Sequence, residues 1–453
     1  MTLLELPFVD PFEAASCLAG RQRLSFLDSA MTHESLGRWS YLASDPVGVF
    51  RVVDGTASWN GVASDGPPLD MLRAVLREFH REPVAGGPPF KGGAIGYLSY
   101  EAGRLFERLP RTQSAARPFA QVDLAFYDTV LAVDVVDKRA FIAARDHSAA
   151  STLRDLLAAH PACRAAVPTL TWHDSRSRAD YEAEVARVVG YVREGDIFQA
   201  NLSHRFSARP ERPVDPIAIY GALRRANPAP FSALLVDGER LIASTSPERF
   251  LALSGRDVEA RPIKGTRRRG SNPARDAELA RELAASEKDR AENVMIVDLL
   301  RNDLSRVCLP GSVEVPVLCG VESYASVHHL TSVVTGRLRP GLGIVDLVAA
   351  SFPGGSITGA PKIRAMEIIA ELEREDRGIY CGSIGWIGFD GCADLNIAIR
   401  TMSFDGETLS IGAGGGITLL SKPDEEYEET LAKAERLFQP LQGPAQADEE
   451  AAA

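Results

Sequence analysis

The sequence lacks several features that mark whole classes of protein. No stretch approaches the roughly 18 uninterrupted apolar residues of a membrane-spanning helix, and the start carries no basic segment followed by a long apolar one. Only six residues are cysteine, and no two form a CxxC pair, so neither a zinc motif nor a disulfide scaffold is indicated. Positive charge is in deficit, with 50 Lys and Arg against 61 Asp and Glu. We therefore expect a soluble, cytoplasmic protein with reduced core thiols that binds neither nucleic acid nor a membrane.

The length of 453 residues allows up to three domains of about 150 residues each. Apolar residues make up 45% and charged residues 25%, as in ordinary globular proteins, and no repeat of 20 to 50 residues is visible. We expect an N-terminal region at 1–150 and a catalytic region at 178–438, linked by residues 148–177 into one compact body. The Ala- and Glu-rich tail at 442–453 is predicted to be disordered.

Hydrophobic spacing predicts the main helices and strands. Helices are expected at 70–81, 178–194 and 422–438, and one long or two consecutive helices at 273–307. Short β-like runs are expected at 94–100 and 124–136, and a strand pair joined by the turn SPER at 241–253. Because strands and helices do not alternate regularly, the sequence predicts a large α+β fold rather than a doubly wound parallel sheet.

The predicted helix at 422–438 has two distinct faces. One face is apolar and the opposite face is charged: the apolar stripe is Tyr427, Leu431, Ala434 and Phe438, and the charged cluster is Glu426, Glu429 and Lys433. Taken alone, the charged cluster is typical of a solvated helix face.

A second helix carries carboxylates in an apolar setting. Residues 294–300 are apolar nearly all round, which predicts a buried helix, yet four acids are embedded in or beside it: Asp289, Glu292, Asp298 and Asp303. A buried carboxylate is costly unless it is paired. Ion pairs with Arg290, Arg301 or Arg306 would account for Asp298 and Asp303. For Asp289 and Glu292 a shared hard cation is equally plausible, and oxygen ligands without His or Cys nearby suit Mg²⁺.

A lysine and a glutamate stand in short motifs that suit covalent or acid–base chemistry. Lys264 lies in RPIKGTRRRG between an isoleucine and a glycine, where a turn can remove it from solvent. Loss of solvation lowers the pKa of a lysine and makes its amine nucleophilic, although a basic surface loop explains the same residues. Glu248 of TSPERF is expected at a strand end, where it suits either a general acid or base or a turn-capping carboxylate.

Glycine-rich segments offer backbone amides to an anion. FPGGSITGAPK departs from a nucleotide-binding loop because Ala and Pro separate its last glycine from Lys362. Ser356 or Thr358 near an N-cap, with Pro361 near the first helical position, would still expose free amides to a carboxylate. GAGGGI at 412–417 is interpreted either as a similar concave run of N–H groups or as a tight turn.

Two further observations concern histidine and cysteine. His328 and His329 follow a strand-like segment, and the usual explanation of such residues is a hydrogen-bonded core histidine. No cysteine stands in a Gly-x-Cys-x-Gly elbow. We therefore expect no glutaminase site in this chain.

Together these segments resemble the chorismate-utilising enzymes, the family of anthranilate synthase component I, aminodeoxychorismate synthase component I, isochorismate synthase and salicylate synthase. The resemblance covers about residues 178–438 and rests on DIFQANLS, SPERF, PIKGT, ENVMIVDLLRNDLSRV, VHHL, FPGGSITGAPK, IAIRT, GAGGGI and DEEYEET. RLSFLDSA and GRWSYLASDP resemble the segment that lines a tryptophan pocket in some members. The fold implied is a large two-sheet, β-sandwich-like core with surrounding helices.

The resemblance implies a role for each matching residue. Glu292 and Glu429 would hold Mg²⁺, with Asp289 and Glu426 as nearby acids, and the ion would hold the ring carboxylate of chorismate. The residues implied to orient the substrate carboxylates are Tyr380, Arg400, Lys433 and the Gly416 amide. Ser356 and His329 would line the ring, and the catalytic residues implied are Lys264, Glu248 and His329.

Lys264 is the position that separates activities within the family. PIKGT is similar to the aminodeoxychorismate synthases, whereas anthranilate synthases typically carry PIAGT. The resemblance implies that Lys264 adds to C2 of chorismate as the C4 hydroxyl leaves, with Glu248 as general acid, and that ammonia then attacks C4 and expels the lysine. The product would be 4-amino-4-deoxychorismate, the precursor of p-aminobenzoate and folate. A separate glutamine amidotransferase subunit would supply the ammonia.

Other activities of the family are alternatives to this interpretation. Anthranilate synthesis for tryptophan, in which ammonia adds at C2 and pyruvate leaves, is the nearest. Lys264 speaks against it because an occupied C2 face directs the amine to C4. Isochorismate synthesis, with water at C2, and a catalytically silent scaffold subunit are less favoured, the latter because every proposed metal and substrate residue is present.

Overall fold

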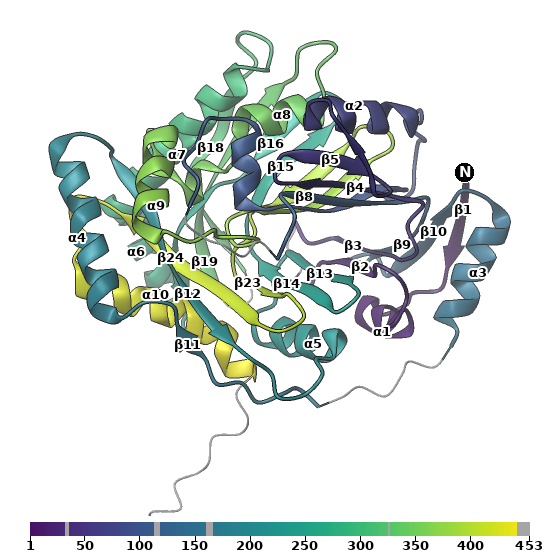
Figure 1. Cartoon of the computed structure of the whole chain (residues 1–453), viewed down its shortest axis with the longest axis horizontal. Helices are drawn as coiled ribbons and strands as arrows, with labels where there is room; N and C mark the ends of the chain where they lie inside the picture. Colours follow the sequence, from purple (N-terminus) through teal and green to yellow (C-terminus); the bar gives the residue numbers. More distant parts are fainter. Residues whose placement is uncertain (32–35, 113–117, 160–165, 325–326, 442–453) are drawn as a thin grey trace, which may run out of the picture.

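Two large antiparallel sheets face each other, and helices cover their outer faces (Figure 1). The computed structural model describes residues 1–31, 36–112, 118–159, 166–324 and 327–441. The predicted tail at 442–453 and Cys163 lie outside the described residues. The arrangement confirms the expected α+β class with a two-sheet, β-sandwich-like core.

The first sheet has 12 strands drawn from both halves of the chain. In spatial order they are β1 (Thr2–Leu6), β10 (Arg139–Ala144), β9 (Thr129–Asp134), β3 (Trp39–Ala43), β2 (Ser25–Asp28), β13 (Phe231–Asp237), β14 (Arg240–Ser246), β23 (Thr401–Phe404), β24 (Leu409–Ile417), β12 (Gln199–Ala208) and β11 (His173–Asp174), with β20 (Gly359–Ala360) paired to β12. The two halves of the chain join where β2 pairs with β13, which sets Asp28 opposite Ser232.

The second sheet also has 12 strands from both halves. In order they are β17 (Ile263–Arg268), β19 (Val327–Arg337), β16 (Asp257–Ala260), β15 (Arg249–Ser254), β22 (Ala393–Asn396), β21 (Ser383–Gly388), β7 (Gly93–Leu98), β8 (Val122–Tyr127), β4 (Gly48–Val53), β5 (Thr56–Trp59) and β6 (Val62–Ser64), with β18 (Glu314–Ser323) paired to β19. Here the halves join where β7 pairs with β21. The N-terminal region therefore contributes strands to both sheets.

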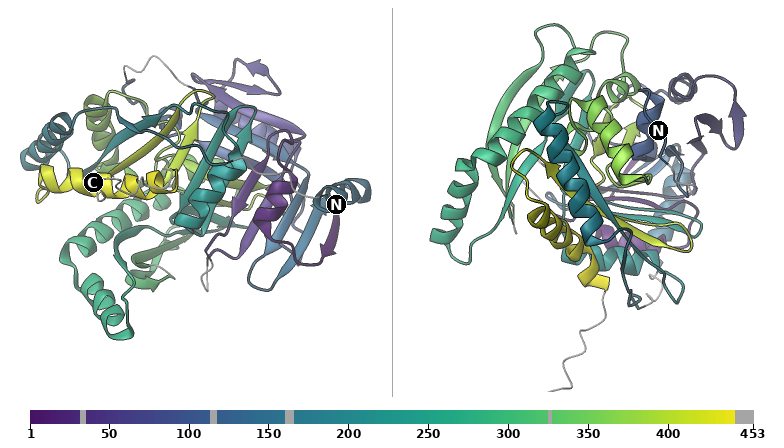
Figure 2. Two further views of the ribbon diagram at one scale, coloured as in Figure 1. Left: turned by 90° about the horizontal axis from the view of Figure 1, so that it is seen from below. Right: turned by 60° about the vertical axis from the view of Figure 1, so that its left-hand side comes forward.

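Helices fill in the outer layers. They are α1 (Pro11–Cys17), α2 (Pro68–Glu78), α3 (His147–Leu157), α4 (Arg178–Glu194), α5 (Pro216–Ala226), α6 (Pro273–Ala285), α7 (Glu287–Ser305), α8 (Ile344–Ser351), α9 (Lys362–Glu373) and α10 (Pro423–Phe438), with short 3₁₀ turns η1 (Tyr100–Leu105), η2 (Gly355–Ile357) and η3 (Gln439–Leu441). Figure 2 shows α10, in yellow, lying alongside α4 on one flank of the molecule. No helix among these described residues is long and apolar enough to cross a membrane.

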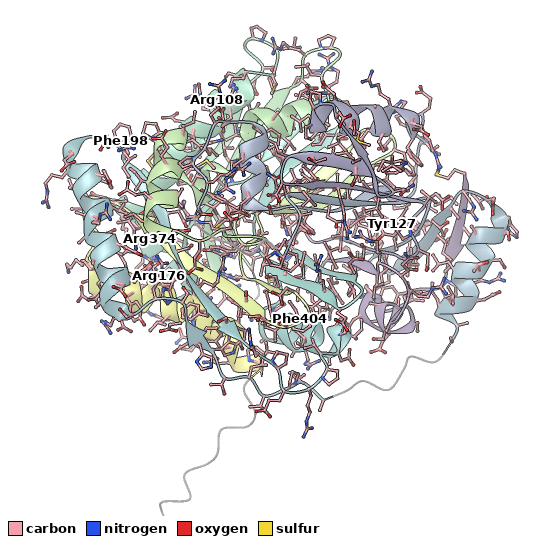
Figure 3. The ribbon with its side chains drawn as sticks, in the orientation of Figure 1. Arg108, Tyr127, Arg176, Phe198, Arg374 and Phe404 are labelled. Carbon is pink, nitrogen blue, oxygen red and sulfur yellow. The ribbon has the colours of Figure 1, made fainter. Side chains whose placement is uncertain are left out.

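The core has three main parts. Between the sheets, Tyr41 and Leu235 of the first sheet pack with Tyr97 and Trp386 of the second. Tyr127, labelled in Figure 3, lies in this layer and shares a 2.9 Å hydrogen bond with Ser25 of the facing sheet. A second cluster packs α7 and α8 on the second sheet, and a third packs α1, α5 and α10 on the first. Close packing on both faces of each sheet fixes the strand ends that carry the site.

The long amphipathic helices are where the spacing predicted them. Helix α4 spans Arg178–Glu194 because the Ser177 hydroxyl accepts from the Asp180 amide at its start and Gly195 adopts a left-handed φ of 85° at its end. The 273–307 segment divides into α6 and α7, and Ser286 ends one helix while capping the next. These predictions are confirmed.

The strand prediction at 241–253 is half right. Both strands exist, but β14 belongs to the first sheet and β15 to the second, so they do not pair with each other. The segment SPER is therefore a crossover between the sheets rather than a hairpin turn. Local sequence does not show to which sheet a strand belongs, because β14 pairs with β23 and β15 with β22, which are both distant in the chain.

The carboxylates of α7 are not all buried. Asp298 is 63% exposed and pairs with Arg301 at 2.9 Å, as predicted. Asp303 is buried, but its partner is Lys362 at 2.7 Å rather than an arginine of the same helix. Val294 is 37% exposed, so the apolar run at 294–300 is only partly buried and the expectation of a fully buried helix was wrong.

Candidate active site

Glu248 occupies the crossover between the two sheets. Its side chain is 5% exposed, and its backbone carbonyl accepts from the Ile397 amide at 3.0 Å. Burial raises the pKa of the Glu248 carboxyl, while the Lys264 charge and the Ser356 hydroxyl oppose that shift. A carboxylic acid with a raised pKa beside a lysine and a hydroxyl can deliver a proton, so the predicted position at a strand end is confirmed and the surroundings suit a general acid.

Lys264 reaches the same place from β17. The residue lies in the strand rather than in the predicted turn, next to an irregularity at Gly265, whose φ is +81°. The Lys264 ammonium donates to the Ser356 carbonyl at 2.9 Å, and its charge acts on Glu248. Gly265 is required because a Cβ there would lie 2.7 Å from the Asp289 carboxyl carbon. The bulge thus aims Lys264 at Glu248 while α7 packs closely behind it.

The glycine-rich segment before α9 has a different form from that expected. Ser356 lies in the 3₁₀ turn η2, and the Thr358 hydroxyl donates to the Gly354 carbonyl at 2.9 Å. Pro361 is the N-cap residue of α9, directly before the first helical residue Lys362, and no side chain caps that helix. The expected place of Pro361 near the first helical position is confirmed, but neither Ser356 nor Thr358 is the N-cap residue, and Ser356 joins the site through its carbonyl and hydroxyl.

The two histidines of β19 differ in their hydrogen bonding. His328 contacts Ser323 at 2.8 Å and Asp276 at 3.0 Å, as predicted for a core histidine. His329 is 2% exposed and contacts the Thr266 hydroxyl through Nδ1 at 2.9 Å, but its Nε2 has no partner among the described residues. Burial and the nearby Arg400 charge lower the pKa of His329 to about 3, so the ring is neutral.

Carboxylates from α7 and α10 face one another. Burial raises the pKa of Glu292 and of Glu426, and Glu426 adds to the shift of Glu292. Glu429 pairs with Lys433 at 2.8 Å, which lowers the pKa of Glu429. Glu426 is only 6% exposed, so the solvated-face interpretation is wrong for this residue. Asp289 pairs with Arg267 at 3.3 Å.

This acidic group has the charge that a hard cation would neutralise. Glu292 and Glu426 hold raised pKa values because burial and neighbouring carboxylates disfavour their ionised forms. Oxygen donors of this kind suit Mg²⁺. Within the described ranges, however, no three His, Cys, Asp or Glu side chains come close enough together to hold a metal ion. The charge of the group fits Mg²⁺, and its present spacing is wider than a coordination sphere.

The glycine run at 412–417 is neither a turn nor a concave loop. It forms the end of β24 and pairs with β12, which sets Gly416 opposite Asn201. Its glycines allow close approach: a Cβ on Gly412 would overlap the Tyr380 ring, and one on Gly415 would lie 3.4 Å from both Glu426 and Lys433. The Lys433 ammonium donates to the Gly414 carbonyl at 2.9 Å. Because these glycines have no side chains, Glu426 and Lys433 of α10 can lie close to the backbone of β24.

Arg400 and Tyr380 complete the predicted set. Arg400 is a partly buried cation with a φ of 49°, and no hydrogen bond or ion pair of its side chain is found among the described residues. Burial and the Arg436 charge lower the pKa of Arg400 to about 10. Burial raises the pKa of Tyr380 well above its usual value. The Tyr380 ring packs over Gly412. The pKa of the neighbouring Cys381 thiol is raised mainly by burial, and the Glu248 charge adds to that shift.

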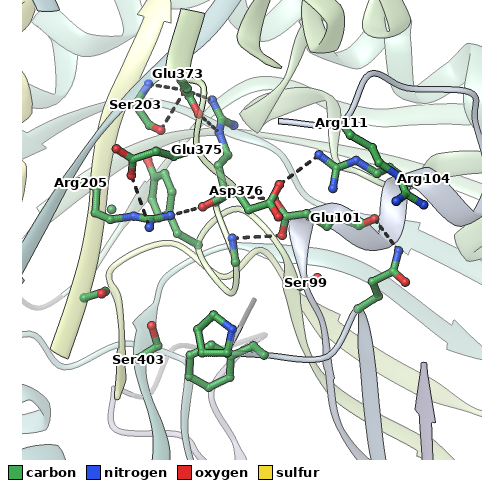
Figure 4. A pocket seen from close by; sticks show the side chains of 18 of the residues that line it. Ser99, Glu101, Arg104, Arg111, Ser203, Arg205, Glu373, Glu375, Asp376 and Ser403 are labelled. Carbon is green, nitrogen blue, oxygen red and sulfur yellow. Dashed lines mark hydrogen bonds and ion pairs between the residues drawn. The ribbon is translucent and has the colours of Figure 1, made fainter. Parts of the chain in front are cut away.

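A separate hollow of about 400 Å³ is lined by Tyr380 together with Glu373 and Arg377 (Figure 4). Glu373, 5% exposed, accepts from the Arg377 guanidinium at 2.6 and 2.8 Å and from the Ser203 amide and hydroxyl at 2.8 and 2.9 Å. Arg377 also donates to the Ile357 carbonyl at 2.9 Å, one residue beyond Ser356. This ion pair thus lines the hollow and connects it to the residue that follows Ser356.

The segments compared with a tryptophan pocket line a smaller cavity of about 260 Å³. Its walls include Asp28, Ser29 and Trp39 from those segments, together with Phe231 and Trp386. Asp28 is engaged by Tyr220 at 2.9 Å and by Arg224 at 2.5 Å. These segments therefore do line a cavity. That the cavity binds tryptophan stays a prediction.

Gln199 is a residue that motif reading did not single out. Its amide is buried, and neither the oxygen nor the nitrogen has a partner among the described residues. The side chain lies over Gly416, where any Cβ would overlap it. The available signal was a neutral amide at the start of a mostly apolar strand, DIFQANL, which is costly unless something polar binds there.

The geometry agrees with comparisons to known proteins. The sequence matches the family described as chorismate binding enzyme across residues 28–439. This chain belongs to that family. It is 43% identical over 415 residues to aminodeoxychorismate synthase component 1 of Salmonella typhimurium, covering 89% of this chain and 90% of that relative. It is 39% identical over 459 residues to anthranilate synthase component 1 of Streptomyces coelicolor, covering 95% and 86%.

A solved structure supports the same membership in the chorismate-binding enzymes. Anthranilate synthase component I from Streptococcus pneumoniae superposes with a TM-score of 0.80 at 33% identity, covering 90% of this chain and 94% of that one. The expected family and its two-sheet fold are therefore confirmed. Relatives with two different activities match, so the choice between them depends on the residues of the site.

Proposed function

We propose that this chorismate-binding enzyme aminates chorismate at C4, giving 4-amino-4-deoxychorismate for p-aminobenzoate and folate synthesis. The observation that carries the proposal is the contact of Lys264 with Ser356 beside the buried Glu248. An amine and a carboxyl of raised pKa side by side supply the nucleophile and the acid that a two-step displacement requires. The relatives named aminodeoxychorismate synthase component 1 support the same choice.

The reaction balances without an oxidant or reductant. The Lys264 ammonium gives up a proton to solvent and its amine forms a bond to C2, the ring double bonds shift, and the C4 hydroxyl leaves as water with a proton from Glu248. Ammonia then forms a bond to C4 as the bond from C2 to Lys264 breaks, and the protons return to solvent and to Glu248. The sum is chorismate plus ammonia giving the amino product plus water. His329, held neutral, would line the ring without adding charge.

We propose Glu292 and Glu429 as the residues that would hold Mg²⁺, with Glu426 and Asp289 beside them. When bound, the ion would polarise and fix the ring carboxylate of chorismate. A Mg²⁺ titration of activity tests this assignment: Glu429→Gln should shift the half-saturating concentration upward. Glu425→Gln is the matched control, because Glu425 is exposed on the same helix and pairs with Lys422. An unchanged Mg²⁺ requirement in Glu429→Gln would remove that residue from the site.

The ammonia would come from a glutamine amidotransferase subunit. The name component 1 of the relatives indicates that those proteins act with another component. No cysteine of this sequence stands in a nucleophile elbow, so glutamine hydrolysis is assigned to that partner.

Anthranilate synthesis is the second candidate, since a relative with that name matches across 95% of this chain. Product analysis separates the two. Purified protein is mixed with chorismate, Mg²⁺ and an ammonium salt, and the products are identified by mass spectrometry before and after an aminodeoxychorismate lyase is added. Formation of p-aminobenzoate only after lyase addition supports C4 amination. Anthranilate without lyase would assign the chain to tryptophan synthesis instead.

A further inference from the structure

Two successive carbonyls of the η2 turn accept hydrogen bonds from two different cations. The Lys264 ammonium of β17 donates to the Ser356 carbonyl at 2.9 Å. The Arg377 guanidinium donates to the Ile357 carbonyl, also at 2.9 Å. Ser356 and Ile357 are both buried, and a buried carbonyl without a donor would cost free energy. The turn is therefore attached to the candidate nucleophile at one residue and to Arg377 at the next.

Arg377 also ties this turn to β12. The backbone amide of Asn201 donates to the Thr358 carbonyl at 2.7 Å, so the third carbonyl in the row has a donor as well. The Asn201 carbonyl in turn accepts from the Arg377 guanidinium at 2.5 Å. One guanidinium group thus bridges the η2 turn and the strand beside it.

Arg377 itself is held at both its side chain and its backbone. The guanidinium donates to Glu373 of α9 at 2.6 and 2.8 Å, and Figure 4 shows Glu373 bound to Ser203 as well. The Arg377 backbone amide donates to Glu101 of η1 at 2.8 Å. The guanidinium carbon lies 4.6 Å from the centre of the Tyr100 ring, and the side chain is only 2% exposed. These contacts fix the direction in which Arg377 presents its donors.

The orientation of η2 matters for the chemistry because Ser356 contacts both residues of the expected proton and bond transfers. Its carbonyl accepts from Lys264, and its hydroxyl donates to the Glu248 carboxyl. The peptide planes that carry the Ser356 and Ile357 carbonyls are rigid and are joined only through φ and ψ of Ile357. A donor that fixes the second plane therefore limits how far the first can turn.

We propose that Arg377 is a positioning residue for the amination: it holds the η2 turn so that Ser356 keeps the Lys264 amine beside the Glu248 carboxyl. This inference rests on the proposed function, because it assigns Arg377 to the step in which Lys264 forms a bond to C2. An arginine suits this task since its planar fork can donate to a carboxylate and to two carbonyls at once. The single ammonium group of a lysine cannot span the same three acceptors.

The test follows adduct formation on Lys264 in single turnovers with chorismate and Mg²⁺ but without ammonia, by peptide mass spectrometry of quenched samples. Arg377→Lys keeps the charge beside Glu373 and loses the carbonyl contacts. The adduct should therefore form about 10- to 100-fold more slowly, while the chorismate concentration that gives half the maximal rate stays within about twofold. A general loss of folded protein would lower the amount of adduct without changing the rate constant of its formation.

Glu373→Gln separates positioning from the stability of the ion pair. In this variant the Arg377 guanidinium can still donate to the Ile357 and Asn201 carbonyls, so adduct formation should slow by less than about threefold although the fold is destabilised. Should Arg377→Lys not fold, the double variant Glu373→Gln/Arg377→Gln removes both charges without leaving either unpaired. The same slow adduct formation is expected of it.

Arg23→Lys is the matched control. Arg23 is another buried arginine, and it donates to both carboxylate oxygens of Asp123 in β8 at 2.7 and 3.1 Å. Its replacement should lower the free energy of unfolding and leave the rate of adduct formation within about twofold, because distant sites act independently. Adduct formation at the wild-type rate in Arg377→Lys, or equal slowing in Arg377→Lys, Glu373→Gln and Arg23→Lys, would overturn the inference.

A failure of the proposed function is recognised separately. If wild-type protein forms no adduct, the covalent step fails, and acetylation of Lys264 by acetic anhydride in the absence of chorismate tests the positioning alone. The amine should be acetylated faster in Arg377→Lys than in wild type, because the Ser356 carbonyl no longer holds it. Equal acetylation rates of Lys264 in the two proteins would contradict the role of Arg377.

Discussion

Glu248 and Glu373 are equally buried, at 5% exposure each, yet their environments drive their pKa values in opposite directions. In the hollow of Figure 4, the Arg377 guanidinium holds the pKa of Glu373 below its usual value in spite of burial. In the candidate active site burial prevails, and the pKa of Glu248 is raised. The comparison shows two uses of a buried carboxyl. An ion pair keeps Glu373 charged where it supports the fold, whereas Glu248 has a raised pKa where proton transfer is expected.

The largest effect is expected when the amine beside Glu248 is removed. Lys264→Ala should reduce C4 amination on the order of 10⁴-fold, about 5 kcal/mol in activation free energy, because the covalent route loses its nucleophile. The measurement is the initial rate of p-aminobenzoate formation with excess lyase. Lys422→Ala, an exposed lysine beside Glu425, is the control. Undiminished C4 amination in Lys264→Ala would refute the covalent mechanism.

The paired region should respond in stability instead. Glu373→Gln leaves Arg377 buried without its counter-ion and should lower the free energy of unfolding by about 3–5 kcal/mol, measured by urea denaturation. Asp298→Asn in the exposed pair with Arg301 should change it by less than about 1 kcal/mol. Equal stabilities of the two variants would show that the buried pair is not structural.

Glu248→Gln should show the reverse behaviour. Gln resembles the protonated carboxyl that burial favours, so the free energy of unfolding should stay close to that of wild type. Loss of the general acid should lower kcat on the order of 10²- to 10³-fold. If Glu248→Gln lowers the free energy of unfolding as much as Glu373→Gln does, the proposed difference between the two buried carboxyls is contradicted.

Glu101 sharpens the comparison because it lies in the paired region, yet no ion pair within the described part of the chain involves its carboxyl. Its carboxyl accepts from the amides of Arg377 and Gly378 at 2.8 and 3.0 Å, and burial with the Asp376 charge raises its pKa to about 7. Between pH 4.5 and 7 the folded state keeps a proton that the unfolded state releases. Stability should therefore fall with rising pH across this range by up to about 1.4 kcal/mol per unit.

The matched variant for this titration is Glu101→Gln. It should lose that part of the pH dependence and become more stable than wild type at pH 8. Parallel stability profiles for wild type and variant, measured by urea denaturation between pH 4.5 and 8, would show that Glu101 does not titrate as described.

Helices with strong local signals were predictable from the sequence. Helix α4 is predicted by the spacing of its apolar residues, by a serine cap at its start and by a glycine at its end. The sequence also predicts the apolar and the charged face of α10. What could not be predicted depends on neighbours distant in the chain. The two sheets joined at SPER and the Lys362 partner of Asp303 are set by tertiary packing, which local periodicity does not encode.

The candidate site shows the same division. Motif resemblance identified Lys264, Glu248 and Ser356, which the fold brings together from β17, the sheet crossover and η2. The burial of Glu426 and the unpaired Gln199 amide were not visible, because each depends on which face α10 or β12 turns toward the rest of the molecule. A glycine run can equally build a loop or a strand under a helix, and only packing decides between them.

The most direct test of the poised pair is peptide mass spectrometry of enzyme quenched during incubation with chorismate and Mg²⁺ in the absence of ammonia. The account predicts that the peptide containing Lys264 gains the mass of chorismate minus water, that Glu248→Gln greatly reduces this adduct, and that ammonia discharges it. Wild-type enzyme that aminates C4 while Lys264 stays unmodified under every quench condition would contradict the central claim.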